Sequence, residues 1–242
     1  MKTILIGDIH GRDTWKKVIE RESPNRVIFI GDYFDSFDIP GIDQIHNFKE
    51  IIHFKENTDI EVIMLIGNHD HHYLDVGETY SGFQHILQHD IKWALKENMK
   101  HLQLCYSFDN ILSSHAGISS VWLDNTLGSS WDEETLVETL NDLYQYQPTK
   151  FNFQGSDPYG DSIQSSPIWI RPKSLTRSNR KTDLKKNWIQ IVGHTEFEKI
   201  DMKMSLQAYG NKYFFIDALE NGWYMKWENN ILTPKTNNKG VW

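Results

Sequence analysis

The chain has 242 residues, enough for one substantial core, and nothing in its length requires a second domain. Hydrophobic residues make up 39% and aromatic residues 13%, which is more core material than a disordered chain carries. The formal net charge of -8 disfavours broad attraction to nucleic acid or to anionic membranes. The single cysteine, Cys105, excludes an internal disulfide, and no apolar run approaches the roughly 20 residues of a transmembrane helix. Since no signal-peptide core precedes Asp8, we expect a soluble cytoplasmic protein that forms one domain over residues 1–242.

Short apolar runs that stop at a glycine or a small polar residue predict buried strands. They occupy Thr3–Ile6, Val27–Ile30, Val62–Ile66, Ile111–Leu112 and Ile189–Val192. Between the first three runs, the spacing of apolar residues predicts two helices. The first is expected to be capped by Asp13. The second is expected to place one set of apolar residues on a common face: Ile42, Ile45, Phe48 and Ile52.

The rest of the chain divides into helical, irregular and strand-like parts. Apolar spacing predicts helices over residues 79–99 and 132–144. Residues from about 147 to 187 contain four prolines among many Ser, Asn, Gly and Asp, which predicts a long irregular loop. Strands are expected again at 205–209, 212–216 and 223–227, separated by glycine and asparagine turns. This pattern predicts a mixed α/β fold in which a second, partly antiparallel sheet closes onto the first.

Five of the predicted strands are followed by side chains that can bind metal ions. The segments are GDIHG at 7–11, GDYFD at 31–35, GNHD at 67–70, HAG at 115–117 and GHT at 193–195. Because loops beyond the carboxyl ends of strands line the ligand crevice of an α/β sheet, these segments should converge on one site. Each segment alone is better explained as a turn, a helix cap or a buried histidine, but the five together argue against that explanation.

The candidate ligands are two carboxylates, three imidazoles and one amide: Asp8, His10, Asp32, Asn68, His115 and His194. This set is too rich in nitrogen for calcium or magnesium alone and suits manganese, iron or zinc. Six protein side chains also exceed the three or four that one such ion takes from protein. Two ions that share a bridging carboxylate are the economical interpretation.

The ordered motifs resemble the calcineurin-like metallophosphoesterase superfamily, and GDIHG, SHAGI and GHT resemble its phosphoprotein phosphatase branch. That branch includes bacterial and phage protein phosphatases and diadenosine tetraphosphate hydrolases. The resemblance, which spans residues 7–195, implies an α/β fold, a four-layer α/β-β-α sandwich, with a dimetal centre at one edge. It implies that the first ion, most simply manganese with iron or zinc as alternatives, is held by Asp8, His10 and Asp32. Asp32 would bridge to the second, which is completed by Asn68, His115 and His194.

The resemblance also suggests which residues act on the substrate. His69 would protonate the leaving group, and Asp35 would orient its imidazole and raise its pKa, as in the family's histidine–aspartate pair. Arg171, in the run WIRP, resembles the family's phosphate-binding arginine, although a solvent-facing loop arginine is the alternative. His71 and His72 are expected to be surface residues at a helix start.

The chain departs from the branch directly after GDYFD. An arginine and a glycine are usual there, whereas this chain has Ser36 and Phe37, so one phosphate-clamping arginine is missing. Arg12 is a candidate replacement. Residues 171–186 carry seven basic residues and one acidic residue, which would steer a phosphorylated protein or an oligonucleotide end, or form a solvated loop.

These features predict a dinuclear metal-dependent phosphoesterase that hydrolyses phosphate monoesters of a protein or a small metabolite with a hydroxide bridging the metals. The missing arginine keeps open an alternative, a phosphodiesterase or dinucleoside polyphosphate hydrolase. A non-catalytic module that keeps its metals would be expected to lose the acid or a ligand, and this chain retains both. The expected partner is therefore a phosphorylated substrate, with nucleic acid disfavoured and no membrane.

Overall fold

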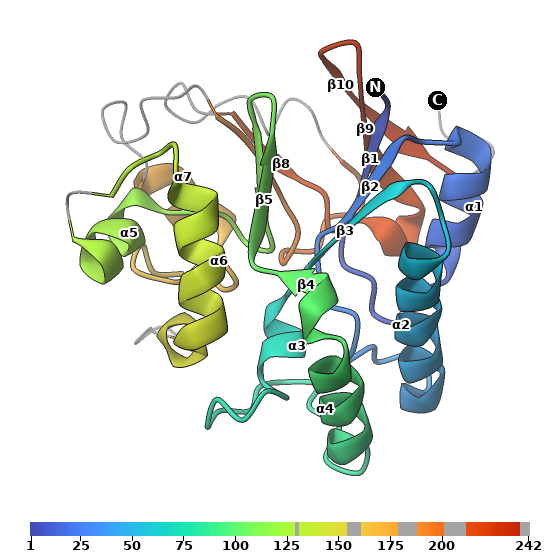
Figure 1. Ribbon diagram of the computed structural model, residues 1–242, viewed down its shortest axis with the longest axis horizontal. Coiled ribbons are helices and arrows are strands. Elements are labelled where there is room, and N and C mark those ends of the chain that lie inside the picture. The colour runs from blue at the N-terminus through green and yellow to red at the C-terminus, as the bar shows by residue number, and fades with distance from the viewer. Residues whose placement is uncertain (129–130, 154–160, 179–187, 201–211, 238–242) are drawn as a thin grey trace.

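Two β-sheets form the framework of the computed structural model (Figure 1), which describes residues 1–128, 131–153, 161–178, 188–200 and 212–237. The first sheet has the strand order β10-β9-β1-β2-β3-β4, and the second has the order β5-β6-β7-β8. The strands of the first sheet are β1 Thr3–Ile6, β2 Arg26–Phe29, β3 Glu61–Leu65, β4 Leu102–Gln103, β9 Trp223–Glu228 and β10 Ile231–Thr236. Those of the second are β5 Cys105–Phe108, β6 Ile111–Ser114, β7 Ile189–Val192 and β8 Lys212–Phe215.

Both sheets are mixed, with a parallel part that carries the central strands. Strands β1 to β4 run parallel, with Thr3 opposite Arg26, while β9 and β10 add antiparallel strands beyond β1. In the second sheet β6, β7 and β8 run parallel and β5 is antiparallel to β6. Each parallel set therefore brings the carboxyl ends of its strands to one edge.

Helices cover the outer faces of the two sheets. Figure 1 shows α1 (Thr14–Glu22) and α2 (Gly41–Glu56) at the first sheet, with α5 (Ser120–Leu127) and α6 (Leu136–Tyr146) on the opposite side of the molecule. The remaining helices are α3 Asn68–His71, α4 Gln88–Glu97 and α7 Pro172–Ser178, with short 3-10 turns at Met99–His101, Pro148–Phe151 and Leu219–Asn221. Among the described residues, no helix combines the length and hydrophobicity that crossing a bilayer requires.

The four-layer order follows from the alternation of side chains along the buried strands. In β1, Ile4 and Ile6 pack in the same cluster as Trp15 of α1 and Phe48 of α2. The intervening Leu5 points to the other face, in a cluster that also holds side chains of β7 and β8. A third cluster joins the second sheet to α5 and α6. Helix, sheet, sheet and helix therefore stack in the sandwich that the sequence motifs imply.

Several sequence-based expectations about local structure need correction. The helix expected over 79–99 is restricted to Gln88–Glu97, because the preceding residues form turns in which Gly82 has φ +86°. Asp13 precedes α1 but makes no side-chain capping hydrogen bond. Ile42 is 48% exposed, so it does not share the buried face of α2. The irregular stretch at 147–187 contains α7, which begins at Pro172, where a missing N–H costs nothing. The strand expected at 205–209 lies outside the described residues.

Candidate metal and catalytic site

Loops from both sheets meet at the carboxyl edge of their parallel strands. Asp8, Asp32 and Asn68 follow β1, β2 and β3, while His115 and His194 follow β6 and β7. The side chains of Asp32 and His115 come from different sheets, yet Oδ2 of Asp32 lies 3.2 Å from Nε2 of His115. The fold thus brings together the segments that carry the predicted ligands.

The first cluster of potential donors contains Asp8, His10 and Asp32, whose donor atoms all lie within 4.8 Å of one another. The Nδ1 atom of His10 is 2.5 Å from the carbonyl oxygen of Phe34, while its Nε2 faces Asp32 Oδ2 at 3.9 Å. A backbone carbonyl that accepts from one ring nitrogen leaves the other with a free lone pair. His10 is therefore held in an orientation that suits a metal ligand.

The second cluster shares Asp32 and adds His115 and His194. The Oδ1 atom of Asn68 lies between the two rings, 2.9 Å from His115 Nε2 and 2.8 Å from His194 Nδ1. The other nitrogen of each ring contacts a backbone carbonyl oxygen. Nδ1 of His115 lies 2.9 Å from the oxygen of Ile30, and Nε2 of His194 lies 3.0 Å from the oxygen of Trp169. Nitrogen and oxygen donors thus converge on one point from four loops.

The electrostatics of both clusters fit bound cations. Burial lowers the pKa of His10 and of His194, so both rings are neutral and offer a lone pair. Burial, together with the neighbouring carboxylate of Asp217, raises the pKa of Asp8 well above its ordinary value. Crowded carboxylates of this kind repel one another unless a proton or a cation lies between them. The donor set, without thiolates, therefore suits two divalent metal ions.

Two glycines make the close approach of these loops feasible. A Cβ added at Gly67 would lie 2.0 Å from Asp32 Oδ1, and one added at Gly193 would lie 1.9 Å from Asp8 Oδ1. No real side chain fits at those distances, so any larger residue would displace a carboxylate. The backbone is also strained at four predicted site residues, whose φ angles are positive: His10, Asp32, Asp35 and His194. Such strain is concentrated where the surrounding fold holds functional groups in place.

His69 and Asp35 form a pair beside the two clusters. The Nδ1 atom of His69 lies 3.0 Å from Asp35 Oδ2, and the backbone N–H of His69 donates to Asp32 Oδ1 at 2.9 Å. Burial alone would lower the pKa of His69, but the carboxylates of Asp32 and Asp35 outweigh it and raise the pKa to about 9. The imidazole is therefore a cation at neutral pH and can donate a proton.

Asp35 is held by more partners than the motif suggests. His72 Nε2 lies 2.7 Å from the same Oδ2 atom, and the hydroxyl of Tyr73 donates to Oδ1 at 2.5 Å. The surface position expected for His71 and His72 is wrong, because both are buried. His71 instead contacts the hydroxyl of Tyr144 at 2.8 Å. Residues three apart on one helical turn share a face, so the i, i+3 spacing of His69 and His72 was the available signal.

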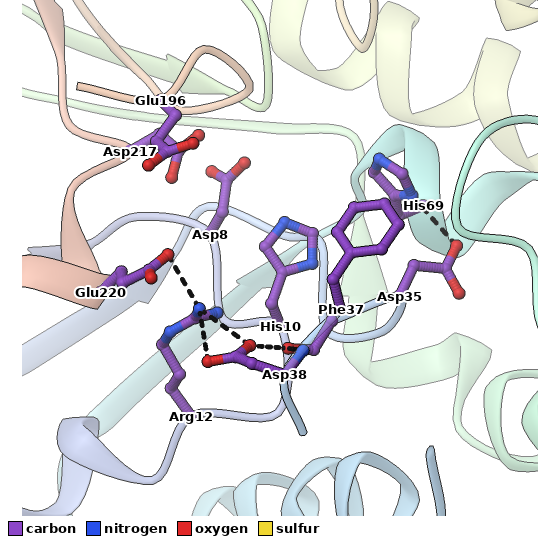
Figure 2. A pocket seen from close by; sticks show the side chains of 11 residues that line it. Asp8, His10, Arg12, Asp35, Phe37, Asp38, His69, Glu196, Asp217 and Glu220 are labelled. Atoms are coloured by element: carbon purple, nitrogen blue, oxygen red, sulfur yellow. Dashed lines mark hydrogen bonds and ion pairs between the residues drawn. The ribbon is translucent and has the colours of Figure 1, made fainter. Parts of the chain in front are cut away.

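A cavity of about 310 Å³ opens beside the first cluster (Figure 2). His10, His69 and Phe37 line it, together with an acidic set: Asp8, Asp35, Asp38, Glu196, Asp217 and Glu220. Arg12 also lines the cavity, and its Nη2 atom pairs with Glu220 at 2.9 Å and with Asp38 at 3.2 Å. Two carboxylates therefore offset the charge of the arginine that was considered as a replacement clamp.

The family of the chain follows from comparison with known proteins. Residues 1–222 match the model of the calcineurin-like phosphoesterase family. The chain belongs to this family. It is accordingly a metal-dependent phosphoesterase, a hydrolase. No curated protein sequence matches it.

Solved structures agree with the sandwich fold of this phosphoesterase. A cold-active protein-tyrosine phosphatase from a psychrophilic Shewanella species is similar with a TM-score of 0.63 and 18% identity, over 98% of this chain and 80% of that one. A metallophosphoesterase from Sphaerobacter thermophilus is similar with a TM-score of 0.53 and 9% identity, over 98% and 89%. At these identities the likeness establishes the fold and leaves the substrate open.

Arg171 of the phosphoesterase lies against the loop that carries His194. Its Nη1 atom donates to the carbonyl oxygen of His194 at 2.8 Å and contacts Thr195 Oγ1 at 3.1 Å. Burial lowers its pKa, although the charges of Asp32 and Asp8 act in the opposite direction. The guanidinium is therefore within the electrostatic field of the donor clusters instead of facing open solvent. Other members of the basic stretch, Arg180, Lys181, Lys185 and Lys186, lie outside the described residues.

Two carboxylates of the phosphoesterase site were missed by sequence reasoning. Asp217 follows β8 and shares a side-chain hydrogen bond with Asp8. Asp70 accepts hydrogen bonds from the backbone N–H groups of Asp32 at 2.9 Å and of Gly67 at 2.8 Å, so it ties the second loop to the third. Asp217 could have been identified from the sequence, because it follows a predicted strand as Asp8 and Asp32 do. Unlike them, it is not preceded by a glycine.

Proposed function

We propose that this phosphoesterase hydrolyses phosphate monoesters, carried by a protein or by a small metabolite. The observation that carries the proposal is the His69–Asp35 pair, 3.0 Å apart, in the same cavity as residues of the first donor cluster. A monoester releases an alkoxide or phenoxide that needs a proton, and a protonated imidazole supplies it. A metal-binding module without catalysis would have no need for this pair.

In this proposal the six predicted ligands hold two cations, with Asp32 common to both. Asp8 and His10 complete one set, and the other is completed by Asn68, His115 and His194. When bound, the ions supply an acidified water and offset the charge at phosphorus. Manganese is the first choice for the donor set, with iron or zinc as alternatives.

The protein's own residues have separate tasks in the reaction. Asp35 accepts from Nδ1 of His69, which directs Nε2 toward the cavity and keeps the ring protonated. Nε2–H donates the proton to the leaving oxygen, and general acid help of this kind contributes about 10²–10⁴-fold. Arg171 binds non-bridging phosphate oxygens through its guanidinium.

The acidic lining of the cavity favours the monoester over one form of the alternative, a dinucleoside polyphosphate, while the other form, a phosphodiester, is separated from it by the turnover test below. Asp38 and Glu220 are exposed at its rim, with side-chain exposures of 62% and 56%. Each further phosphate of a polyphosphate chain would meet these carboxylates. Like-charge repulsion therefore opposes a polyanionic substrate more than a single phosphate that reaches the ions.

The test is turnover of an aryl phosphate by protein reconstituted with manganese, iron, nickel or zinc. We expect activity with at least one metal, and a loss of about 10²–10⁴-fold in kcat for His69→Asn with two ions still bound per chain. His89→Asn, at an exposed histidine, is the matched control and should be unaffected. Absence of turnover with all four metals would overturn the proposal, and a diester preference would replace it by the alternative.

A further inference from the structure

Phe37 is an exposed aromatic side chain in the catalytic cavity. It is 85% exposed, and it lines the cavity together with His10 and His69 (Figure 2). Single exposed apolar residues are common on protein surfaces and need no explanation by themselves. In the described part of the chain, however, the other exposed large apolar side chains lie outside this cavity. The position of Phe37, not its exposure alone, therefore calls for a reason.

The loop that carries Phe37 is anchored on both sides of the ring. On one side, the N–H of Ser36 donates to Oε1 of the buried Gln44 at 3.3 Å. On the other side, Gln44 Nε2 donates to the carbonyl oxygen of Ile39 at 2.6 Å, and Asp38 pairs with Arg12. These bonds hold the backbone on both sides of Phe37. The loop therefore keeps Phe37 at the cavity.

The neighbours of the ring indicate which part of a substrate it would meet. His69, the proposed proton donor, lines the same cavity, so Phe37 lies on the side from which the alkoxide or phenoxide departs. An aromatic face favours an aromatic group, which it removes from water and contacts by stacking. Residues that usually follow the GDxxD motif in the resembling branch are arginine and glycine, and this chain has a hydroxyl and a ring instead.

The charges around the ring narrow the chemistry further. Asp38 and Glu220 stand at the rim, and Arg12, which also lines the cavity, is paired with both. A nucleoside diphosphate or triphosphate also carries an aromatic base, but its additional phosphates would approach these carboxylates. A phenolic group joined to one phosphate offers an aromatic face without them.

We propose that Phe37 determines specificity by stacking on the leaving group, and that the preferred substrates are aryl phosphomonoesters such as a phosphotyrosine side chain. This inference rests on the proposed monoesterase function and deepens it. Phe37 has no part in bond breaking: it adds binding energy on the leaving-group side, which should appear mainly in KM.

The first experiment compares two peptides of the same sequence, one with phosphotyrosine and one with phosphoserine, on the metal-loaded enzyme. Phe37→Ala should raise KM for the phosphotyrosine peptide and lower its kcat/KM about tenfold, the scale of one aromatic contact. The kcat/KM for the phosphoserine peptide should change by less than about twofold. Phe37→Trp, which keeps an aromatic ring, should keep the preference for the phosphotyrosine peptide. Tyr146→Ala, at an aromatic residue that is 72% exposed elsewhere, is the matched control. Equal losses on both peptides, or no loss on either, would overturn the proposal.

A second measurement does not depend on turnover. Benzylphosphonate and ethylphosphonate differ by the ring and cannot be hydrolysed at the C–P bond, so their affinities for metal-loaded protein can be compared by calorimetry. Phe37→Ala should weaken the binding of benzylphosphonate about tenfold and leave the binding of ethylphosphonate unchanged. If the wild-type protein hydrolysed no monoester, the proposed function would fail while this preference still tested Phe37. If Phe37→Ala lowered kcat/KM for adenosine monophosphate as much as for the phosphotyrosine peptide, the ring would be a contact for a nucleobase. That result would overturn the aryl-phosphate proposal.

Discussion

Replacement of Asp35 by Asn tests whether this carboxylate acts through His69. The substitution keeps the shape of the side chain but removes the charge 3.0 Å from His69 Nδ1. Asp35 is one of three carboxylates that raise the pKa of His69 to about 9, the others being Asp32 and Asp70. Without it, the pKa of His69 should fall toward its ordinary value, and less of the enzyme would carry the proton needed for the leaving group.

The size of the effect depends on pH and can be worked out from these values. At pH 8, a pKa of about 9 leaves roughly nine-tenths of the rings protonated, whereas the ordinary 6.5 would leave about 3%. The loss in rate is therefore at most about thirtyfold at pH 8, because Asp32 still supplies part of the rise. At pH 6 both pKa values leave most rings protonated, so the loss almost disappears. Bound cations lower the pKa of His69 in both proteins, so the pH range in which the variant is slower moves to lower pH. The variant should still lose more activity at high pH than at low pH.

The assay is a pH profile of kcat for wild type, Asp35→Asn, His69→Asn and the double variant, each checked for metal content and thermal unfolding. Since residues that act as a unit are not additive, Asp35→Asn should cost little in the His69→Asn background. Tyr73→Phe removes the hydroxyl that donates to Asp35 Oδ1 and leaves the charge in place, so it should keep the wild-type profile. A loss that is independent of pH, or additive losses in the double variant, would refute this reasoning.

Three further outcomes are expected from other positions. Gly193→Ala should reduce the metal content below two ions per chain, as measured by elemental analysis, because the added Cβ would lie 1.9 Å from Asp8 Oδ1. The control is Gly128→Ala, whose Cβ meets nothing within 4 Å and which should keep both ions. Full metal occupancy in Gly193→Ala would contradict the proposed ligand role of Asp8. His71→Leu should lower the free energy of unfolding in urea by about 1–3 kcal/mol while kcat stays unchanged, because its buried hydrogen-bond partners lose their contact. Burial lowers the pKa of His71 to about 4, so its contribution to the free energy of unfolding is complete above about pH 6.5 and is lost as pH falls toward 4. In metal-free protein, the free energy of unfolding should therefore fall less steeply with decreasing pH in His71→Leu than in wild type. Identical pH dependence in the two proteins would argue against a neutral buried His71.

Most of the parallel strands were predictable because their sequences carry two independent signals. Thr3–Ile6 and Ile189–Val192 are largely apolar runs, as strands buried on both faces require, and each is followed by a glycine turn. The strands β4 and β10 lack these signals. Leu102–Gln103 has only two residues, and Ile231–Thr236 is an edge strand that contains a proline and only partly buried or exposed side chains. Their positions depend on pairing with neighbours, which local sequence does not record.

The candidate site divides in the same way between local motif and tertiary packing. His10, Asp32 and His194 follow strand ends, so the rule for parallel sheets was enough to group them. The contact of His72 with Asp35 was not predictable from a rule of this kind, because it depends on how α3 rotates against the second loop. Nor was the pairing of Arg12 with Glu220, whose positions are 208 residues apart.

The charge of the cavity indicates the order in which the site must be filled. In the part of the chain that the structure describes, its lining has six carboxylates and one arginine that is already paired with two of them, so these residues repel a phosphate dianion when no metal is bound. Ser36, in the place of the missing arginine, uses its hydroxyl on Asp38 and adds no charge. Bound cations would reverse the sign of the potential at the point where the donor clusters meet. Phosphate binding should therefore require metal binding, with Arg171 as an auxiliary contact, and the ions would hold the substrate as well as activate the water.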